Sequence, residues 1–231
     1  MEVTEEAILE KVRRLFELSK SSNIHEAEAA MMKAQELLHK YNLDAGAVPT
    51  DEKQPFVREF ITLKNKSRWS ESLMNVIGKY NGVRVIHTAE QLALIGQRHA
   101  IEITIFGYQQ MEKKITWLAE LAWDIEEDKY LFKPGKYMDE YSLGAVYALR
   151  GKLEANKMQF EARDSKESMA LVKVYDAELE RAVTGFYPRL FNRRGPSVGG
   201  DAYARGQRAG GYLEVNAGIT SGGAGRRMLN G

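Results

Sequence analysis

The stretch NGVRVIHTAEQLALIGQRHAIEITIF, residues 81–106, decides the fold class. It contains three short apolar runs, at residues 83–87, 92–95 and 101–106. In the third run, three isoleucines alternate with polar residues, a pattern typical of a strand with one face in solvent. Short connections separate the runs and favour an antiparallel meander. We therefore predict a small antiparallel sheet here.

Helices are predicted on both sides of this stretch. Residues 69–80 have apolar side chains at helical spacing, and the helix ends at Asn81-Gly82 because both residues tolerate a positive φ. Residues 109–132 predict a long helix, and residues 56–63 suit a further strand. The helix, the three runs and the long helix together predict an αβββα core within an α+β fold.

The N-terminal residues predict a helical hairpin. Ile8, Val12 and Leu15 form one apolar stripe, and Asn23 with Glu26 forms a capping box before an alanine-rich second helix. Residues 44–55 mix small, acidic and proline residues without periodicity, which indicates a linker. We expect a hairpin domain at 1–43, a linker at 44–55 and an α+β domain at 56–231.

The C-terminal half is predicted to be largely helical, and its last helix has an unusual composition. Asp201 is predicted to cap this helix, which carries a stripe of mostly small side chains: Ala202, Gly206, Ala209, Gly210 and Leu213. Each helical glycine costs roughly 1 kcal/mol relative to alanine, so a close contact or a ligand must offset that cost. The stripe suits packing within one chain or between two copies, and homo-oligomerisation stays open.

Charge is distributed unevenly along a chain of 231 residues whose formal net charge is only +1. Residues 1–60 have a net charge of −4, whereas residues 182–231 have a net charge of +5 and contain 12 of the 20 glycines. All the bases of this last block are arginines: Arg189, Arg193, Arg194, Arg205, Arg208, Arg226 and Arg227. Arginine offers a planar fork that matches phosphate oxygens and stacks on bases.

A second basic group precedes the predicted sheet. Lys64, Lys66 and Arg68 are followed directly by Trp69, whose ring is expected to provide a stacking surface. Cationic and aromatic side chains together are typical of grooves that bind single-stranded nucleic acid. We therefore expect both basic groups to form one binding surface without strong sequence readout. The opposite interpretation is that the arginines pair with acidic groups or cover a solvated surface.

One part of the chain resembles a known family. NIHEAEAAMMKAQELLHKYNLD, residues 23–44, is similar to the hallmark of the domain of unknown function 2786, and later segments resemble the domain that commonly follows it. The resemblance implies a bacterial or phage protein in a cytoplasmic setting. It implies no catalytic residues.

Several kinds of chemistry lack a sequence signal. The chain has no cysteine, no G-x-S-x-G elbow and no phosphate-binding P-loop, so we predict no catalytic residues and no cofactor. HEAEA at 25–29 lacks the second histidine of a zinc-peptidase helix, and we predict no metal site. No apolar run reaches the roughly 20 residues of a membrane helix.

Nucleic-acid binding is the function that we expect from this sequence, and two alternatives stay open. One is a protein-interaction module, such as a phage protein that binds a host factor through the alanine-rich hairpin. The other is a metal-dependent hydrolase that uses His87 or His99 with nearby acids.

Overall fold

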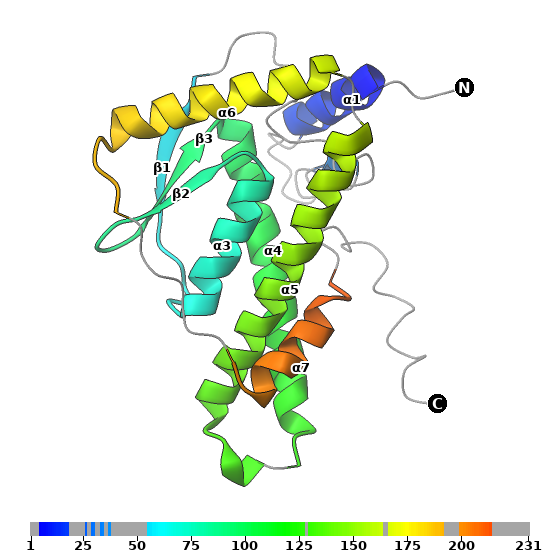
Figure 1. Ribbon diagram of the computed structural model, residues 1–231, viewed down its shortest axis with the longest axis vertical. Coiled ribbons are helices and arrows are strands. Elements are labelled where there is room, and N and C mark those ends of the chain that lie inside the picture. The colour runs from blue at the N-terminus through cyan, green and yellow to red at the C-terminus, as the bar shows by residue number, and fades with distance from the viewer. Residues whose placement is uncertain are drawn as a thin grey trace.

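The computed structural model describes residues 5–18, 55–127, 129–163, 166–191 and 199–213, and six single positions between residues 26 and 37. These residues form an α+β fold, as predicted, in which helices surround a small sheet (Figure 1). The elements are α1 (Glu5–Leu18), β1 (Val57–Ile61), α3 (Arg68–Tyr80), β2 (Arg84–His87), β3 (Leu92–Gly96), α4 (Arg98–Asp124), the 3-10 helix η2 (Lys129–Leu131), α5 (Pro134–Arg163), α6 (Lys166–Phe186) and α7 (Asp201–Gly210).

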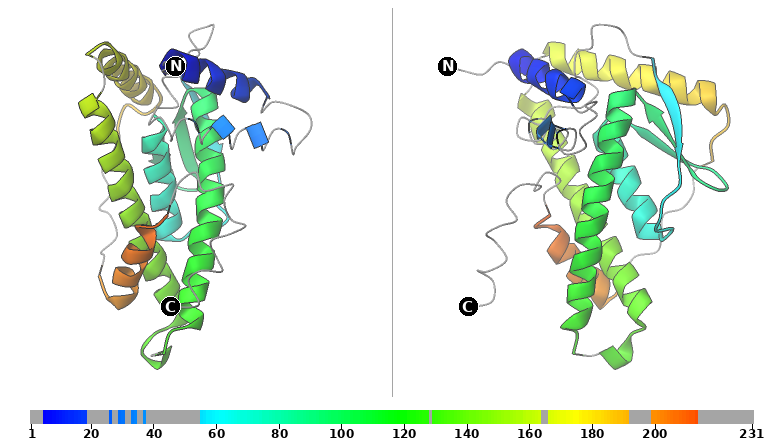
Figure 2. Two further views of the ribbon diagram at one scale, coloured as in Figure 1. Left: turned by 90° about the vertical axis from the view of Figure 1, so that its right-hand side faces the viewer. Right: turned by 180° about the vertical axis from the view of Figure 1, so that it is seen from behind.

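The sheet is antiparallel and has the strand order β1-β3-β2. β3 is buried along its whole length because helices cover both of its faces. Leu92 and Leu94 belong to the main hydrophobic core with residues of α3 and α4, whereas Ile95 packs against Leu179 and Val183 of α6. The molecule is therefore layered, with α3 and α4 on one side of the sheet and α6 lying across the other (Figures 1 and 2).

The prediction of a strand at residues 101–106 is wrong. These residues lie in α4, which begins at Arg98. The buried residues of this helix recur every three or four positions, including Ile101, Thr104, Tyr108 and Met111, so helical packing overrides the β propensity of the isoleucines. The core is therefore βαββα in chain order, because the predicted strand at 56–63 joins the sheet as β1.

The end of α3 follows the prediction. Asn81 is its C-cap, and Gly82 has a φ of 69°, in the left-handed region that glycine adopts without steric cost. At the other end, the hydroxyl of Ser67 accepts a hydrogen bond from the backbone N–H of Ser70 at 3.4 Å. Both ends thus have local polar or conformational reasons to stop at these residues.

The small-residue stripe of α7 packs within the chain, against α5. A Cβ added at Gly206 would lie 2.7 Å from the carbonyl carbon of Tyr141, and one at Gly210 would lie 2.7 Å from the Cα of Ala145. On the α5 side, a Cβ at Gly144 would lie 2.9 Å from the backbone nitrogen of Gln207. The close contact that must offset the helical glycines is therefore the one between these two backbones.

The described part of the N-terminal segment packs onto the rest of the molecule. Ile8 and Val12 of α1, together with Ala34 and Leu37, belong to the same buried cluster as residues of α3, α4 and α5. The predicted cap at Asn23 and almost all of the linker predicted at 44–55 lie outside the described residues. Among the described helices, none is both long and apolar enough to cross a membrane.

Candidate nucleic-acid interface

A row of exposed side chains runs along β1 and on to the start of α3. Between residues 57 and 68 every even-numbered residue is exposed, and every odd-numbered residue is at least partly buried. We call the exposed set the β1 strip; it consists of Arg58, Phe60, Thr62, Lys64, Lys66 and Arg68. It therefore contains four cations, one aromatic ring and no acid.

The opposite side of the same segment explains why the strip contains no acid. Val57, Ile61 and Leu63 pack against the main core, as alternation along a strand requires. Glu59 is the one acid between residues 57 and 68, and it lies on this inner side, where its carboxylate is 3.0 Å from the guanidinium of Arg98. The cations of the strip are thus not faced by an acid of their own segment.

Aromatic rings gather at the β1 end of the strip. The guanidinium of Arg58 lies 5.0 Å from the ring centroids of Phe60 and Phe186 and 5.5 Å from that of Tyr187. These are cation–π distances, and the contacts hold the guanidinium beside exposed aromatic faces. Phe60 is 46% exposed and Phe191, further along the chain, is 92% exposed.

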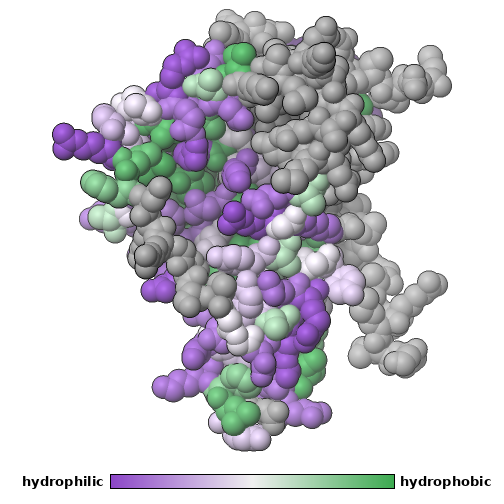
Figure 3. Space-filling view, in the orientation of Figure 1, coloured by the Kyte–Doolittle hydropathy of each residue, from purple (hydrophilic) through white to green (hydrophobic). Residues whose placement is uncertain are grey.

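We call this region the aromatic end; it consists of Arg58, Phe60, Phe186 and Tyr187. Two further exposed residues, Arg189 and Phe191, follow within four positions of Tyr187 in the chain. Figure 3 shows hydrophobic residues gathered below the C-terminal end of α6, on the left of the view, with hydrophilic residues around them. Base stacking and phosphate binding are both available to such a surface.

Arg205, predicted as a phosphate-binding residue, instead forms an ion pair within the protein. Its Nη1 lies 2.7 Å from Oε2 of Glu126, whose side chain is only 2% exposed. Burial works against the charged form of Arg205, but the Glu126 carboxylate and the Tyr137 hydroxyl outweigh it, and the pKa of Arg205 is raised. Arg205 therefore ties α7 to the turn after α4, and the expectation that it contacts nucleic acid stays a prediction for a side chain that already has a carboxylate partner.

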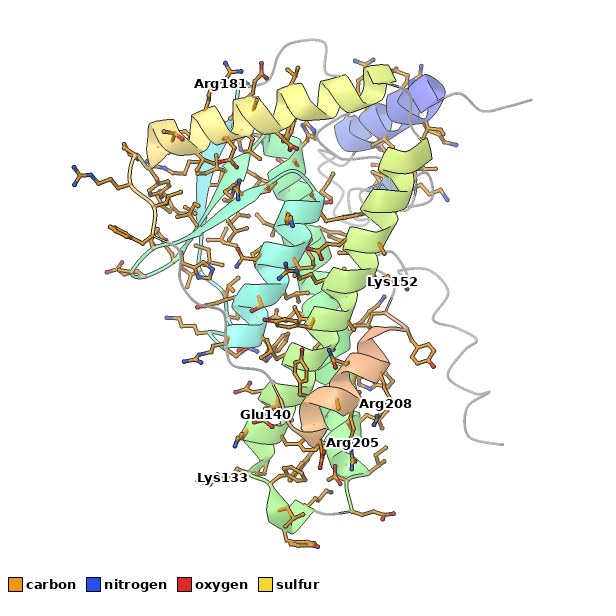
Figure 4. The ribbon with its side chains drawn as sticks, in the orientation of Figure 1. Lys133, Glu140, Lys152, Arg181, Arg205 and Arg208 are labelled. Carbon is orange, nitrogen blue, oxygen red and sulfur yellow. The ribbon has the colours of Figure 1, made fainter. Side chains whose placement is uncertain are left out.

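The described arginines of the C-terminal block do not converge on one surface. Arg208 is exposed on α7, low on the molecule beside α5 (Figure 4). Arg189 follows the end of α6, which lies beside the sheet on the other side of the molecule (Figure 1). The remaining arginines of the prediction, Arg193, Arg194, Arg226 and Arg227, lie outside the described residues.

Trp69 does not provide the stacking surface expected of it. It is only 4% exposed because it lies in the first turn of α3, packed into the main core. Its indole N–H donates a hydrogen bond to the carboxylate of Asp139 on α5. Partial desolvation raises the pKa of Asp139, and the hydrogen bond from Trp69 opposes that rise. Phe60, Phe186 and Phe191 are instead exposed aromatic side chains of the described residues.

The two histidines of the hydrolase alternative lie on different elements, His87 at the end of β2 and His99 in the first turn of α4. His87 Nδ1 is 3.5 Å from Oε2 of Glu71, and its Nε2 is 2.9 Å from the amide nitrogen of Asn75. His99 is buried near the start of α4. In the part of the chain that the structure describes, no three His, Asp or Glu side chains are grouped so as to hold a metal ion.

Comparison with known proteins identifies one segment. Residues 7–45 match the model of a family described as "Protein of unknown function (DUF2786)". This segment is similar to the DUF2786 family. The match confirms the resemblance of residues 23–44, and the DUF2786 segment includes α1. No curated protein and no solved structure matches the chain.

Local sequence signals identify half of the β1 strip. Lys64, Lys66 and Arg68 form a basic group that is visible in the sequence, whereas Arg58 and Phe60 fit the pattern of a strand without any sign of a binding surface. All six residues of the strip have even numbers, and alternate residues of an extended strand face the same way. This alternation is the sequence signal that could have grouped them. The approach of Phe186 to Arg58 has no local signal, because 128 positions separate them in the chain.

Proposed function

We propose that this protein binds single-stranded nucleic acid along the β1 strip and the aromatic end, without strong sequence readout. The observation that carries the proposal is the alternating exposure of residues 57–68, in which four cations and a phenylalanine are exposed and the only acid of the segment is partly buried beside Arg98. Cations along a track with aromatic rings at one end are the features that single-strand binding requires.

The dimensions of the strip support a short binding site. Arg58 and Arg68 are ten residues apart, so the strip spans at most about 33 Å at the strand rise per residue. Modules that bind single strands cover roughly 4–16 nucleotides. In this arrangement Lys64, Lys66 and Arg68 bind phosphates, and Phe60 and Phe191 stack on bases.

The setting that we propose is the one that the DUF2786 resemblance implies, a bacterial or phage protein in the cytoplasm. The absence of cysteine supports a reducing compartment, since such a chain needs no disulfide. Nucleic acid is also available there as a ligand in single-stranded form.

A titration of the full chain with a fluorescently labelled oligothymidylate tests the proposal. The variant Lys64→Ala/Lys66→Ala/Arg68→Ala is expected to bind about 100-fold more weakly at 0.1 M salt, from three lost contacts of about 0.7 log units each. The slope of log affinity against log salt falls by about 2 for the same reason. Fluorescence anisotropy at several salt concentrations measures both quantities.

A matched control separates this surface from general charge. The variant Lys11→Ala/Lys133→Ala/Arg181→Ala also removes two lysines and one arginine, but from exposed positions outside the β1 strip. Figure 4 shows Lys133 and Arg181 at opposite ends of the molecule. We expect this variant to bind as the wild type does. Equal losses in both triple variants, or no binding by the wild type, would contradict the proposal.

The variant Phe60→Ala distinguishes stacking from charge. Stacking on one base contributes about 1–3 kcal/mol, so binding weakens while the salt slope stays unchanged. A change in the slope instead would mean that Phe60 acts by placing Arg58 and not by contacting a base.

A further inference from the structure

The outer face of α4 carries large apolar side chains that the described protein leaves exposed. Trp117 is 60% exposed, Leu121 is 44% exposed and Ile125, just after the helix, is 73% exposed. The spacing of four residues places them along one stripe of a helix. The right-hand view of Figure 2 shows α4 in the foreground, on the outside of the molecule.

Charged residues mark the two ends of this stripe with opposite signs. Lys113 lies one turn before Trp117, Asp124 lies about one turn after Leu121, and all four side chains are exposed. Lys113 and Asp124 are eleven residues apart, which is about three turns, so they lie on the same side of the helix. Glu120, which is also exposed, lies seven residues after Lys113 and so on the same side, and along the axis the face has the order Lys113, Trp117, Glu120, Leu121, Asp124. We call this the α4 face.

From this order of charges we infer that the α4 face binds a second copy of the chain, with the two α4 helices antiparallel across a two-fold axis. In that arrangement Lys113 of each copy lies opposite Asp124 of the other, and each Trp117 lies against the other Leu121. A parallel arrangement would place like charges opposite each other at both ends, which is unfavourable. A two-fold contact uses the same patch on both copies, as this self-complementary face allows.

The size of the face predicts a weak dimer. Tyr130 and Leu131, which are 81% and 64% exposed, extend the apolar surface beyond the end of α4. Side chains of this number and exposure offer of the order of 600 Å² per copy. The total for two copies lies at the low end of specific interfaces, so we expect a dissociation constant in the micromolar range.

Sedimentation equilibrium of the full chain, from about 1 to 200 µM and after nuclease treatment, tests the inference. We expect the wild type to dimerise over this range and Leu121→Asp to remain monomeric. Far-UV circular dichroism checks that the variant folds. A wild type that stays monomeric throughout, or a Leu121→Asp variant that is folded and dimerises like the wild type, would overturn the inference.

Charge exchange tests the antiparallel register with variants that leave the apolar residues intact. Lys113→Asp alone and Asp124→Lys alone each place like charges opposite each other, and each is expected to weaken the dimer about tenfold. Mixing these two variants brings opposite charges together again at both ends, and so does the double variant Lys113→Asp/Asp124→Lys. Recovery in both cases supports the antiparallel pair, whereas single variants as tight as the wild type refute it.

Discussion

The packing of α7 on α5 makes a sharp prediction for Gly206→Ala. The added methyl group would lie 2.7 Å from the carbonyl carbon of Tyr141, and real Cβ atoms essentially never approach another heavy atom within 3.0 Å. The obstacle is backbone and not the end of a flexible side chain, so the two helices must move apart. We therefore expect the substitution to destabilise the protein although alanine is the better helix former.

The magnitude follows from two opposing effects. Forcing a methyl group into a closed contact costs about 3 kcal/mol at the upper end of the usual range. Replacing glycine by alanine within a helix returns about 1 kcal/mol. The free energy of unfolding should thus fall by about 2 kcal/mol. With a urea m-value of about 2 kcal/mol/M, the midpoint of unfolding falls by about 1 M.

Gly151→Ala is the matched control for this prediction. Gly151 also lies within a helix, α5, but a Cβ added there has no atom within 4 Å. Only the helix propensity then changes, and we expect a gain of up to about 1 kcal/mol. Urea unfolding followed by circular dichroism at 222 nm compares the two variants. A midpoint for Gly206→Ala equal to or above that of the wild type would refute the packing argument.

Three further substitutions test the polar contacts of the fold. Arg205→Ala removes the cation beside the buried Glu126 carboxylate, so we expect the free energy of unfolding to fall by about 2–3 kcal/mol, measured by urea titration, with a smaller loss for Arg205→Lys. Tyr108→Phe removes a hydroxyl that lies 2.6 Å from a buried serine hydroxyl, and differential scanning calorimetry should show a loss of about 1–2 kcal/mol. Asp139→Asn keeps an acceptor for the Trp69 indole. Because desolvation raises the pKa of Asp139, its charged form costs stability at neutral pH, and that cost fades as the pH falls. The amide variant should therefore have the higher urea midpoint at pH 7, with its advantage shrinking toward about pH 4; an advantage that grows toward acid pH would contradict this sign.

The sequence predicted those elements whose signals are local. The helix end at Asn81-Gly82 depends on two adjacent residues, and the close packing of α7 depends on glycines spaced along a single helix. Both predictions are confirmed. The prediction of a strand at 101–106 is wrong because the apolar pattern of six residues fits the period of two of a strand as well as the period of 3.6 of a helix. Only the packing of α4 against α3 and the sheet decides between them.

The candidate site also combines residues with a local sequence signal and residues whose position depends on distant contacts. The cations at 64, 66 and 68 are visible in the sequence as a local group, whereas the exposure of Trp69 and the pairing of Arg205 depend on residues far away in the chain. Trp69 is covered by the core and bonds to Asp139, and Arg205 finds Glu126 79 positions away. The number of glycines and arginines in a segment does not reveal such pairings, because composition does not show which carboxylate lies next to a given arginine in the folded protein.

The strand order β1-β3-β2 has a consequence for how the protein is made. The central strand is the last of the three to be synthesised, so β1 and β2 leave the ribosome before the strand that joins them. At about 5–20 residues per second, β1 waits roughly 2–8 s for Gly96 to follow. During that interval β1 is an open strand, and the exposed cation Arg58 on it is the kind of charge that discourages pairing with a wrong strand.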